Sequence, residues 1–324
     1  MKFTATCRRS RGSVARAVGM AVALLASIVL AGCGLGPGEE TGDASLLVTR
    51  DYGSEVLIDE PELPVNESST AMRLVDENAD LETEYGGEYV QTVNGLSGDT
   101  KAGRRFDWFF SVNGIVAERG SAQFPVKGGD KVWWDYRDWT DAMDVGAVVG
   151  AYPAPFSTGY DNRDWGVEID CLVPAATACG MVQKQLEGDG VKLESSGDNM
   201  ILRVGIWDAI ADTPEGRRII RGPENSGVFA RFNAPTTGTP EGAPVNTAWH
   251  LIGLDVRADD ALDYGPESGL VAATRRADDP PVWLITGGTE KAVELAAAAL
   301  NPEDLQRRYA AVVSDGQVTS LPLP

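Results

Sequence analysis

The part of the chain from residue 44 to about residue 145 has the pattern of short strands around one helix. Ala71, Met72 and Val75 follow the cap-rich segment 66–70 at helical spacing, which predicts a helix that ends near Asn78. β-type runs separated by Asn-Gly and Gly-Asp turn signals predict the strands, which are Ser45–Arg50, Glu82–Tyr85, Tyr89–Val93, Phe106–Val112 and Lys131–Tyr136. One helix with several antiparallel strands predicts an α+β arrangement in which a sheet covers the helix.

From about residue 161 to residue 324, strand and helix patterns alternate. An apolar stripe predicts a helix over Ala175–Glu187, and Thr289 caps an Ala-rich segment that ends near Leu300. The predicted strands are Trp165–Cys171, Asn199–Trp207, Gly227–Phe232, Trp249–Asp255 and Val282–Ile285, with a hairpin of Tyr309–Val313 and Gln317–Leu321. This pattern predicts a second domain of the α/β or α+β class.

The two predicted domains, 44–145 and 161–324, are joined by a segment rich in Pro and Gly. We interpret this segment, 146–160, as a linker. Residues 33–43 are Gly-rich and acidic, which predicts a flexible tether in front of the first domain.

Strand parity divides two of the predicted strands between two faces. The even-numbered positions of 106–112 and 131–137 are apolar and should bury against the helix. Phe109 and Trp133 then lie on the opposite face, where exposed aromatic rings are typical of an interaction site. Three further aromatic residues extend this candidate ligand-binding patch: Tyr85, Tyr89 and Trp139. The same parity also fits a face that packs against the second domain.

The first 32 residues have the pattern of a secretory signal peptide. Five basic residues and no acidic residue precede or begin the apolar run 17–30, and small residues follow it. The alternative is a transmembrane helix, but the run is shorter than the ~20 residues that a span needs. The sequence Leu30-Ala31-Gly32-Cys33 resembles the lipobox of bacterial lipoproteins. That resemblance implies cleavage before Cys33, acylation of Cys33 with a fatty acid such as palmitate, and an extracytoplasmic protein anchored to the bacterial cell membrane.

The chain is strongly acidic, with 28 Lys and Arg against 48 Asp and Glu and a net charge of −20. Removing the five basic residues of the first 32 leaves 23 against 48, or about −25. Nucleic-acid binding needs a positive surface, so this charge argues against it. The predicted membrane contact is therefore the lipid on Cys33 and not a basic patch.

The four cysteines divide into two pairs with different expected fates. Cys7 leaves with the signal peptide and Cys33 is acylated, so Cys171 and Cys179 have only each other as partners. In an oxidising compartment we expect them to form a disulfide. Two cysteines and a single histidine make a zinc site unfavourable, and we predict no metal site.

Residues 45–139 resemble the β-grasp domain of the transcobalamin C-terminal type, which also occurs in bacterial secreted proteins and lipoproteins of unknown function. Four stretches carry the resemblance: the helix 71–78, Tyr85–Val90 with Val93-Asn94-Gly95, the aromatic strand Trp108–Gly114, and Lys127–Trp134 with its Gly-Asp turn. The resemblance implies a β-grasp fold and a domain that binds a ligand, with cobalamin as a possible one. No part of the chain requires a bound cofactor.

Other candidate chemistry has a structural interpretation. His250 is the only histidine, and no Gly-x-Ser-x-Gly motif accompanies it, so we expect a structural residue at a strand edge and no catalytic residues. The acidic row Asp135, Asp138, Asp141 and Asp144 is interpreted as a solvated face and not as a calcium site. Arg217, Arg218 and Arg221 form a dense basic cluster, which either receives an anion or neutralises nearby acids.

The sequence thus predicts a lipid-anchored extracytoplasmic protein that binds and does not catalyse. Its expected partners are the membrane, a small-molecule ligand and a membrane transporter. The alternative is a structural or protein-interaction lipoprotein at the cell surface, and a hydrolase ranks third.

Overall fold

The computed structural model describes residues 38–163, 165–172, 175–194, 197–235 and 248–324. Residues Glu40–Pro324 cluster as one compact unit. The predicted signal peptide and the lipidation site Cys33 lie outside the described residues. No helix in the described part of the chain is both long and apolar enough to cross a membrane. The division into two domains joined at 146–160 stays a prediction.

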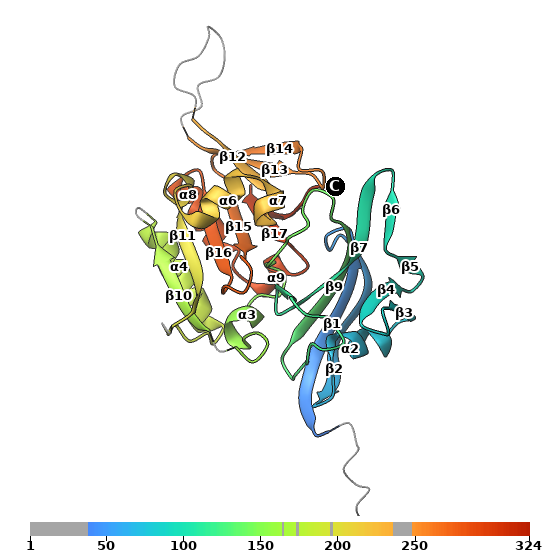
Figure 1. Ribbon diagram of the computed structural model, residues 1–324. Coiled ribbons are helices and arrows are strands. Elements are labelled where there is room, and N and C mark those ends of the chain that lie inside the picture. Colours follow the sequence, from blue (N-terminus) through green and yellow to red (C-terminus); the bar gives the residue numbers. More distant parts are fainter. Residues whose placement is uncertain (1–37, 164, 173–174, 195–196, 236–247) are drawn as a thin grey trace, which may run out of the picture. The chain divides into compact units, whose positions relative to one another are not determined.

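The first sheet comprises strands from the N-terminal half of the chain: β1 (Glu40–Arg50), β2 (Glu55–Asn66), β6 (Asp99–Lys101), β7 (Arg104–Val112), β8 (Ile115–Val116) and β9 (Lys131–Asp138). The strands lie in the order β2-β1-β9-β7-β6, with β8 paired to β7. The central pair, β1 and β9, is parallel, and β2 and β7 flank it as antiparallel neighbours (Figure 1). The sheet with its parallel central pair fits the α+β class, and the β-grasp fold itself stays a prediction from the sequence.

Helix α2 (Ala71–Asp76) begins where the side chain of Thr70 accepts a hydrogen bond from the backbone N–H of Arg73, at 3.2 Å. Its apolar side buries Ala71, Leu74 and Val75. A small three-stranded sheet follows the helix and is formed by β3 (Leu81–Glu84), β4 (Tyr89–Val93) and β5 (Leu96–Ser97).

The predicted strand parity is confirmed on the face that meets α2. The core cluster around the helix contains Trp108 and Val112 from β7 and Val132, Trp134 and Tyr136 from β9. Because side chains alternate between the faces of a strand, the odd-numbered residues of β7 and β9 point to the opposite side.

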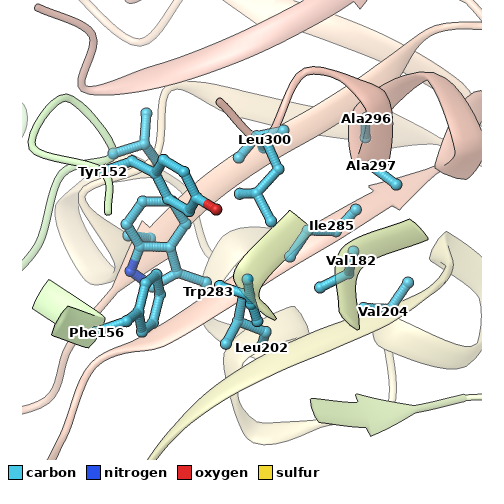
Figure 2. Packing of buried hydrophobic residues seen from close by; sticks show 14 of the residues in the cluster. Tyr152, Phe156, Val182, Leu202, Val204, Trp283, Ile285, Ala296, Ala297 and Leu300 are labelled. Atoms are coloured by element: carbon cyan, nitrogen blue, oxygen red, sulfur yellow. The ribbon is translucent and has the colours of Figure 1, made fainter. Parts of the chain in front are cut away.

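The second sheet is formed by β10 (Gly166–Cys171), β11 (Asn199–Ile206), β15 (Gly269–Thr274), β16 (Val282–Gly287), β17 (Ala310–Ser314) and β18 (Gln317–Leu321). The order is β10-β11-β16-β15-β17-β18, parallel across the first three strands and antiparallel thereafter. Helices α4 (Ala176–Gly188) and α8 (Glu290–Ala298) contribute Val182 and Ala296 to a core shared with Leu202 and Ile285 of this sheet (Figure 2). The mixed α+β class is therefore confirmed.

A second core cluster joins the two sheets. It contains Tyr52 and Trp133 from the first sheet region and Leu270, Leu284 and Val312 from the second. The odd face of β9 is thus partly covered by the C-terminal half of the chain.

The shorter elements of the chain are α3 (Ala154–Ser157), α5 (Trp207–Ile210), α6 (Pro214–Ile220), α7 (Pro223–Ser226), β12 (Ala230–Asn233), β13 (His250–Leu254), β14 (Asp260–Gly265) and α9 (Pro302–Leu305).

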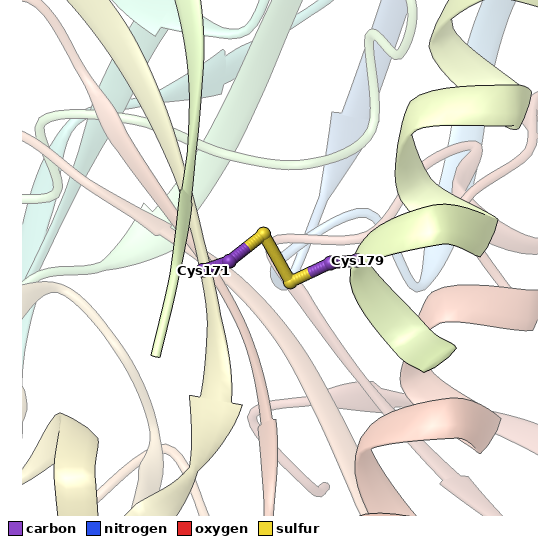
Figure 3. Close-up of a disulfide and its surroundings, with 2 residues drawn as sticks. All are labelled: Cys171 and Cys179. Carbon is purple, nitrogen blue, oxygen red and sulfur yellow. A yellow bond between two sulfur atoms is a disulfide. The ribbon is translucent and has the colours of Figure 1, made fainter. Parts of the chain in front are cut away.

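The predicted disulfide is present between Cys171, the last residue of β10, and Cys179 in α4 (Figure 3). The two Cα atoms are 6.0 Å apart, and the bridge spans a sequence separation of 8. It ties the edge strand of the second sheet to the helix that covers it.

The structure differs from the expectations in three details. Strand β1 starts at Glu40, inside the predicted tether 33–43, because backbone pairing with β2 does not require apolar side chains. The sequence pattern did not predict β2, which contains Pro61 and Pro64. The sheet tolerates these prolines because β2 is an edge strand. The segment 146–160 is largely buried, which its Pro and Gly content did not indicate, while its role as a linker stays a prediction.

Candidate functional site

The odd face of the first sheet has a tightly packed end around Asp135. The carboxylate of Asp135 accepts hydrogen bonds from the Thr49 hydroxyl at 2.5 Å, the Tyr309 hydroxyl at 2.9 Å, and the backbone N–H groups of Tyr52 at 3.0 Å and Gly53 at 3.2 Å. Burial raises the pKa of Asp135 to about 6, while these donors oppose the shift. The network connects β1 and β9 to Tyr309, which lies 174 residues further along the chain.

Arg137 fills the space beside this network. Its side chain is buried, donates to the carbonyl of Ala142 at 2.9 Å, and lies 4.0 Å from the ring centroid of Phe109. The void between Phe109, Trp133 and Tyr309 measures only about 10 Å³, roughly the space of one water molecule. Phe109 and Trp133 do share a face, as predicted, but at this end the face packs against the C-terminal part of the chain.

Trp133 is therefore not an exposed aromatic residue. It is 6% exposed, its ring meets that of Tyr309 edge to face at 5.2 Å between centroids, and its indole N–H donates to the Thr49 hydroxyl at 2.8 Å. The expectation of a free ring failed because the covering residue is distant in sequence. The alternative left open by the sequence, a face that packs against the second part of the chain, describes this contact.

The other end of the same face is hollow. A cavity of about 530 Å³ lies over the start of β1 and β9 and is open to solvent. Its other walls are formed by Asp59, Pro61 and Glu62 of β2, by Gly150 and Ala151, and by Gln306 and Arg307. We call it the Lys131 cavity. Trp133 lines its inner wall and is the only one of the five predicted aromatic residues that does so.

Lys131 is the distinctive residue of this cavity. It is half-buried, and its ammonium group donates to the backbone carbonyl of Tyr152 at 3.2 Å. Burial lowers the pKa of Lys131, and no ion pair with an acid is found for it in the described part of the chain. A half-buried cation without an acidic partner is unfavourable unless something else supplies negative charge.

The acid beside Lys131 in the sequence, Asp130, also lines the cavity, but its carboxylate is bonded to other groups. The carboxylate of Asp130 accepts from the Asn113 side-chain amide at 2.8 Å and from the backbone N–H of Lys127 at 2.9 Å. Burial raises the pKa of Asp130. Asp130 therefore holds the turn before β9, and its hydrogen bonds do not extend to the ammonium group of Lys131.

The rest of the cavity wall combines apolar surface, one further cation and an acidic mouth. Leu47 and Trp133 supply the apolar part, and Arg307 is exposed at the rim without a side-chain hydrogen bond or ion pair to any residue that the structure describes. Three exposed acidic residues line the same opening: Asp43, Asp59 and Glu62. The mixture suits a ligand with an apolar body and one anionic group that reaches inward.

Two glycines allow the wall of the cavity to close. A Cβ atom on Gly150 would lie 2.7 Å from the ring of Trp133, and one on Gly53 would lie 2.4 Å from the carbonyl oxygen of Arg307. Gly53 also has a φ of +82°, which favours glycine. Close backbone approach at these two points sets the distance between the first sheet and the segment around Arg307.

The remaining predicted aromatic residues lie away from the Lys131 cavity. Tyr85 is 79% exposed in the turn between β3 and β4 and meets the ring of Tyr89 at 6.1 Å. The hydroxyl of Tyr89 donates to Asp107, and burial is the main cause that raises the Tyr89 pKa. Trp139 is half-buried beneath the guanidinium of Arg105, at 3.7 Å. The five aromatic residues therefore do not form one patch.

The acidic row is not the solvated face that the sequence indicated. Asp135 and Asp138 are buried, and Arg104 forms ion pairs with Asp138 and Asp141. No group of three or more His, Cys, Asp or Glu side chains that could hold a metal ion is found among the described residues. His250 lies on β13 with Nδ1 at 3.1 Å from a carboxylate oxygen of Asp263.

The residues 68–138 match a described family. The model that they match is that of a domain of unknown function, DUF4430. A crystal structure from Ruminococcus gnavus, described as that of a "putative metal binding protein", is similar at 18% identity and a TM-score of 0.23, over 30% of this chain and 97% of that one. A search of curated proteins finds no match. The matched region runs from just before α2 to the end of β9 and so contains Lys131, Trp133 and Asp135.

Sequence reasoning missed Lys131 and Arg307 as site residues. Strand parity placed Lys131 on the same face as Trp133, but only the aromatic residues of that face were selected as candidate binding residues. Arg307 carried no signal, because only the folded chain brings it to the start of β9.

Proposed function

We propose that this protein is an extracytoplasmic binding protein that captures a small organic anion in the Lys131 cavity. The observation that carries the proposal is a cavity of about 530 Å³ that is lined by Lys131, a half-buried lysine that forms no ion pair with an acid in the described part of the chain. Cavities of this size are typical of sites for small molecules.

The walls indicate what kind of ligand fits. A carboxylate or similar anion would meet the ammonium of Lys131 and the guanidinium of Arg307, and an apolar body would lie on Leu47 and Trp133. The acidic mouth of the cavity would repel molecules that carry several negative charges. The family resemblance suggested cobalamin, whereas a cavity of about 530 Å³ favours a smaller ligand, which we propose instead.

The proposed location rests on the N-terminal sequence. The resemblance of residues 30–33 to a lipobox supports a protein whose acylated Cys33 attaches it to the outer side of the cell membrane. The disulfide between Cys171 and Cys179 fits an oxidising compartment. Metabolic labelling with an alkynyl fatty acid is the test: we expect label on the wild type and none on Cys33→Ser, and an unlabelled wild type would overturn the anchor.

The ligand proposal is tested with the full-length protein purified in a neutral detergent. Native mass spectrometry first looks for a retained small molecule, and a panel of aromatic and aliphatic carboxylates, with cobalamin included, is then titrated against tryptophan fluorescence. We expect a monocarboxylate to bind and Lys131→Gln to weaken it about 10- to 100-fold, the effect of one lost charge-assisted hydrogen bond. Lys127→Gln is the matched control, because Lys127 is an exposed cation in the same turn.

The outcomes separate the proposals clearly. Equal affinity of Lys131→Gln and the wild type would show that the ligand is not held in this cavity. Binding of cobalamin with no monocarboxylate binding would replace the small-anion proposal by the one that the family resemblance suggested.

One observation favours the alternative of a protein-interaction lipoprotein. Tyr85 is 79% exposed at the tip of a hairpin, where its ring is open to a protein partner, and tyrosine is enriched at protein interfaces. Cross-linking from a photoreactive residue at position 85 tests this alternative: one specific adduct in cells would support it, and its absence would leave Tyr85 a solvent-exposed turn residue.

A further inference from the structure

The pocket beside α6 concentrates positive charge in an acidic protein. Four arginines line a pocket of about 560 Å³, namely Arg217, Arg218 and Arg221 from α6 and its end, and Arg276 from the segment after β15. We call this the arginine pocket. Only two acidic residues line it, Asp144 and Glu224, in a chain whose net charge is −20. None of its residues lines the Lys131 cavity.

The amphipathic character of α6 explains why the arginines point outward together. Gly216 and Ile219 are the buried residues of the helix, and Arg217 and Arg221 are four positions apart on its exposed side. Like charges at this spacing on a helix repel each other.

The side chain of Arg218 is held in place at the pocket by two hydrogen bonds. Its Nε donates to the carbonyl of Asn225 and one terminal nitrogen to the carbonyl of Arg275, both at 2.8 Å. Burial is the main cause that lowers its pKa, and the charge of Arg276 lowers it further, whereas Asp144 and Glu215 oppose the shift. Arg276 and Arg218 are thus close enough to repel each other.

The other three arginines are free to bind. Arg217, Arg221 and Arg276 are exposed, and their side chains form no hydrogen bond or ion pair within the described part of the chain. Glu215, the acid nearest to them on α6, is paired instead with Arg203. The sequence left open whether this cluster neutralises local acids, and the structure shows that its free members do not.

We infer that the arginine pocket binds a phosphate group. Planar guanidinium groups from two directions, α6 and the segment after β15, match the several oxygens of a phosphate and bind them through paired hydrogen bonds. Four arginines against two acids among the lining residues leave an excess of two positive charges, which balances the charge of about −2 on a phosphate monoester. The phosphate belongs either to a soluble metabolite or to a lipid headgroup at the membrane surface.

Calorimetry on the full-length protein in a neutral detergent at low ionic strength tests this inference. The probes are inorganic phosphate and dihexanoyl phosphatidic acid below its micellar concentration, so that the two sources of phosphate are compared directly. We expect one site per chain, weakened at least 10-fold in the triple variant Arg217→Gln, Arg221→Gln, Arg276→Gln. The variant should keep its fold, because all three side chains are exposed and unpaired. An unchanged far-UV spectrum checks this.

A matched control removes three exposed cations elsewhere: Lys184→Gln, Arg257→Gln and Lys291→Gln. This control loses the same charge and should bind the probes as the wild type does. Tighter binding of the short-chain lipid assigns the pocket to a headgroup, and tighter binding of inorganic phosphate assigns it to a soluble ligand. No binding of either probe at 10 mM, or equal loss in the two triple variants, would overturn the inference. Lys131→Gln separates this pocket from the Lys131 cavity, because it should leave phosphate binding unchanged.

Discussion

Tyr309→Phe tests whether the polar network around Asp135 holds the two halves of the described chain together. The substitution removes only the hydroxyl that donates to the Asp135 carboxylate at 2.9 Å. The ring contacts with Tyr52 at 4.9 Å and Trp133 at 5.2 Å remain, so the packing is preserved. The carboxylate keeps its three other donors, from Thr49, Tyr52 and Gly53.

The expected loss follows from the chemistry of this bond. A buried hydrogen bond to an ionised group contributes roughly 1.5–3 kcal/mol, which corresponds to a fall in Tm of roughly 3–12 °C for a protein of this size. Tyr309 is only 7% exposed, so solvent does not replace the lost donor. Urea unfolding of the full-length protein at pH 8, followed by tryptophan fluorescence, measures the free energy of unfolding.

Tyr85→Phe is the matched control for this experiment. Tyr85 is 79% exposed, so water satisfies its hydroxyl in both the folded and the unfolded state. We expect a change within about 0.5 kcal/mol, as for a typical surface substitution. If Tyr309→Phe were as harmless as Tyr85→Phe, the network would not stabilise this contact and the reasoning would be refuted.

Three further predictions concern the same fold. Because burial raises the pKa of Asp135 to about 6, the folded protein holds a proton that the unfolded chain has released. The contribution of this carboxyl to stability should therefore fall as pH rises from about 4 to 6, at up to ~1.4 kcal/mol per pH unit, and Asp135→Asn should flatten that slope in pH-dependent unfolding. Gly150→Ala should cost about 1–3 kcal/mol in thermal unfolding, because the new methyl group meets the ring of Trp133 at 2.7 Å, whereas Gly180→Ala has open space and should be neutral or stabilising. Replacing both disulfide cysteines by serine should lower the free energy of unfolding by ~2–3 kcal/mol, and a reductant should produce the same loss in the wild type but none in the variant.

Local rules were sufficient to predict much of the fold. Alternation along β7 and β9 assigned the correct residues to the face of α2, and the cap-rich segment 66–70 and Thr289 were correctly placed at the start of their helices. These predictions depend on neighbours within a few residues, where backbone geometry fixes which side chains meet. Strand β2 was not predicted, because its two prolines and exposed acidic residues resemble a loop unless its position at the edge of the sheet is known.

The site could be predicted only in part, because its second wall is distant in sequence. Parity showed that Phe109, Lys131 and Trp133 share a face, but not what covers that face. Tyr309 and Arg307 come from the segment before β17 and decide that one end is sealed and the other is hollow. Whether an aromatic residue is exposed depends on such remote contacts, which no local pattern encodes.

The central position of β1 has a mechanical consequence. A tensile force that enters the chain at Glu40 acts along the axis of β1, which is hydrogen-bonded to β2 on one side and to β9 on the other. Both ladders would then carry the load in shear, with many hydrogen bonds strained together rather than opened one after another. A protein held at that end should resist unfolding by a force applied elsewhere in the chain.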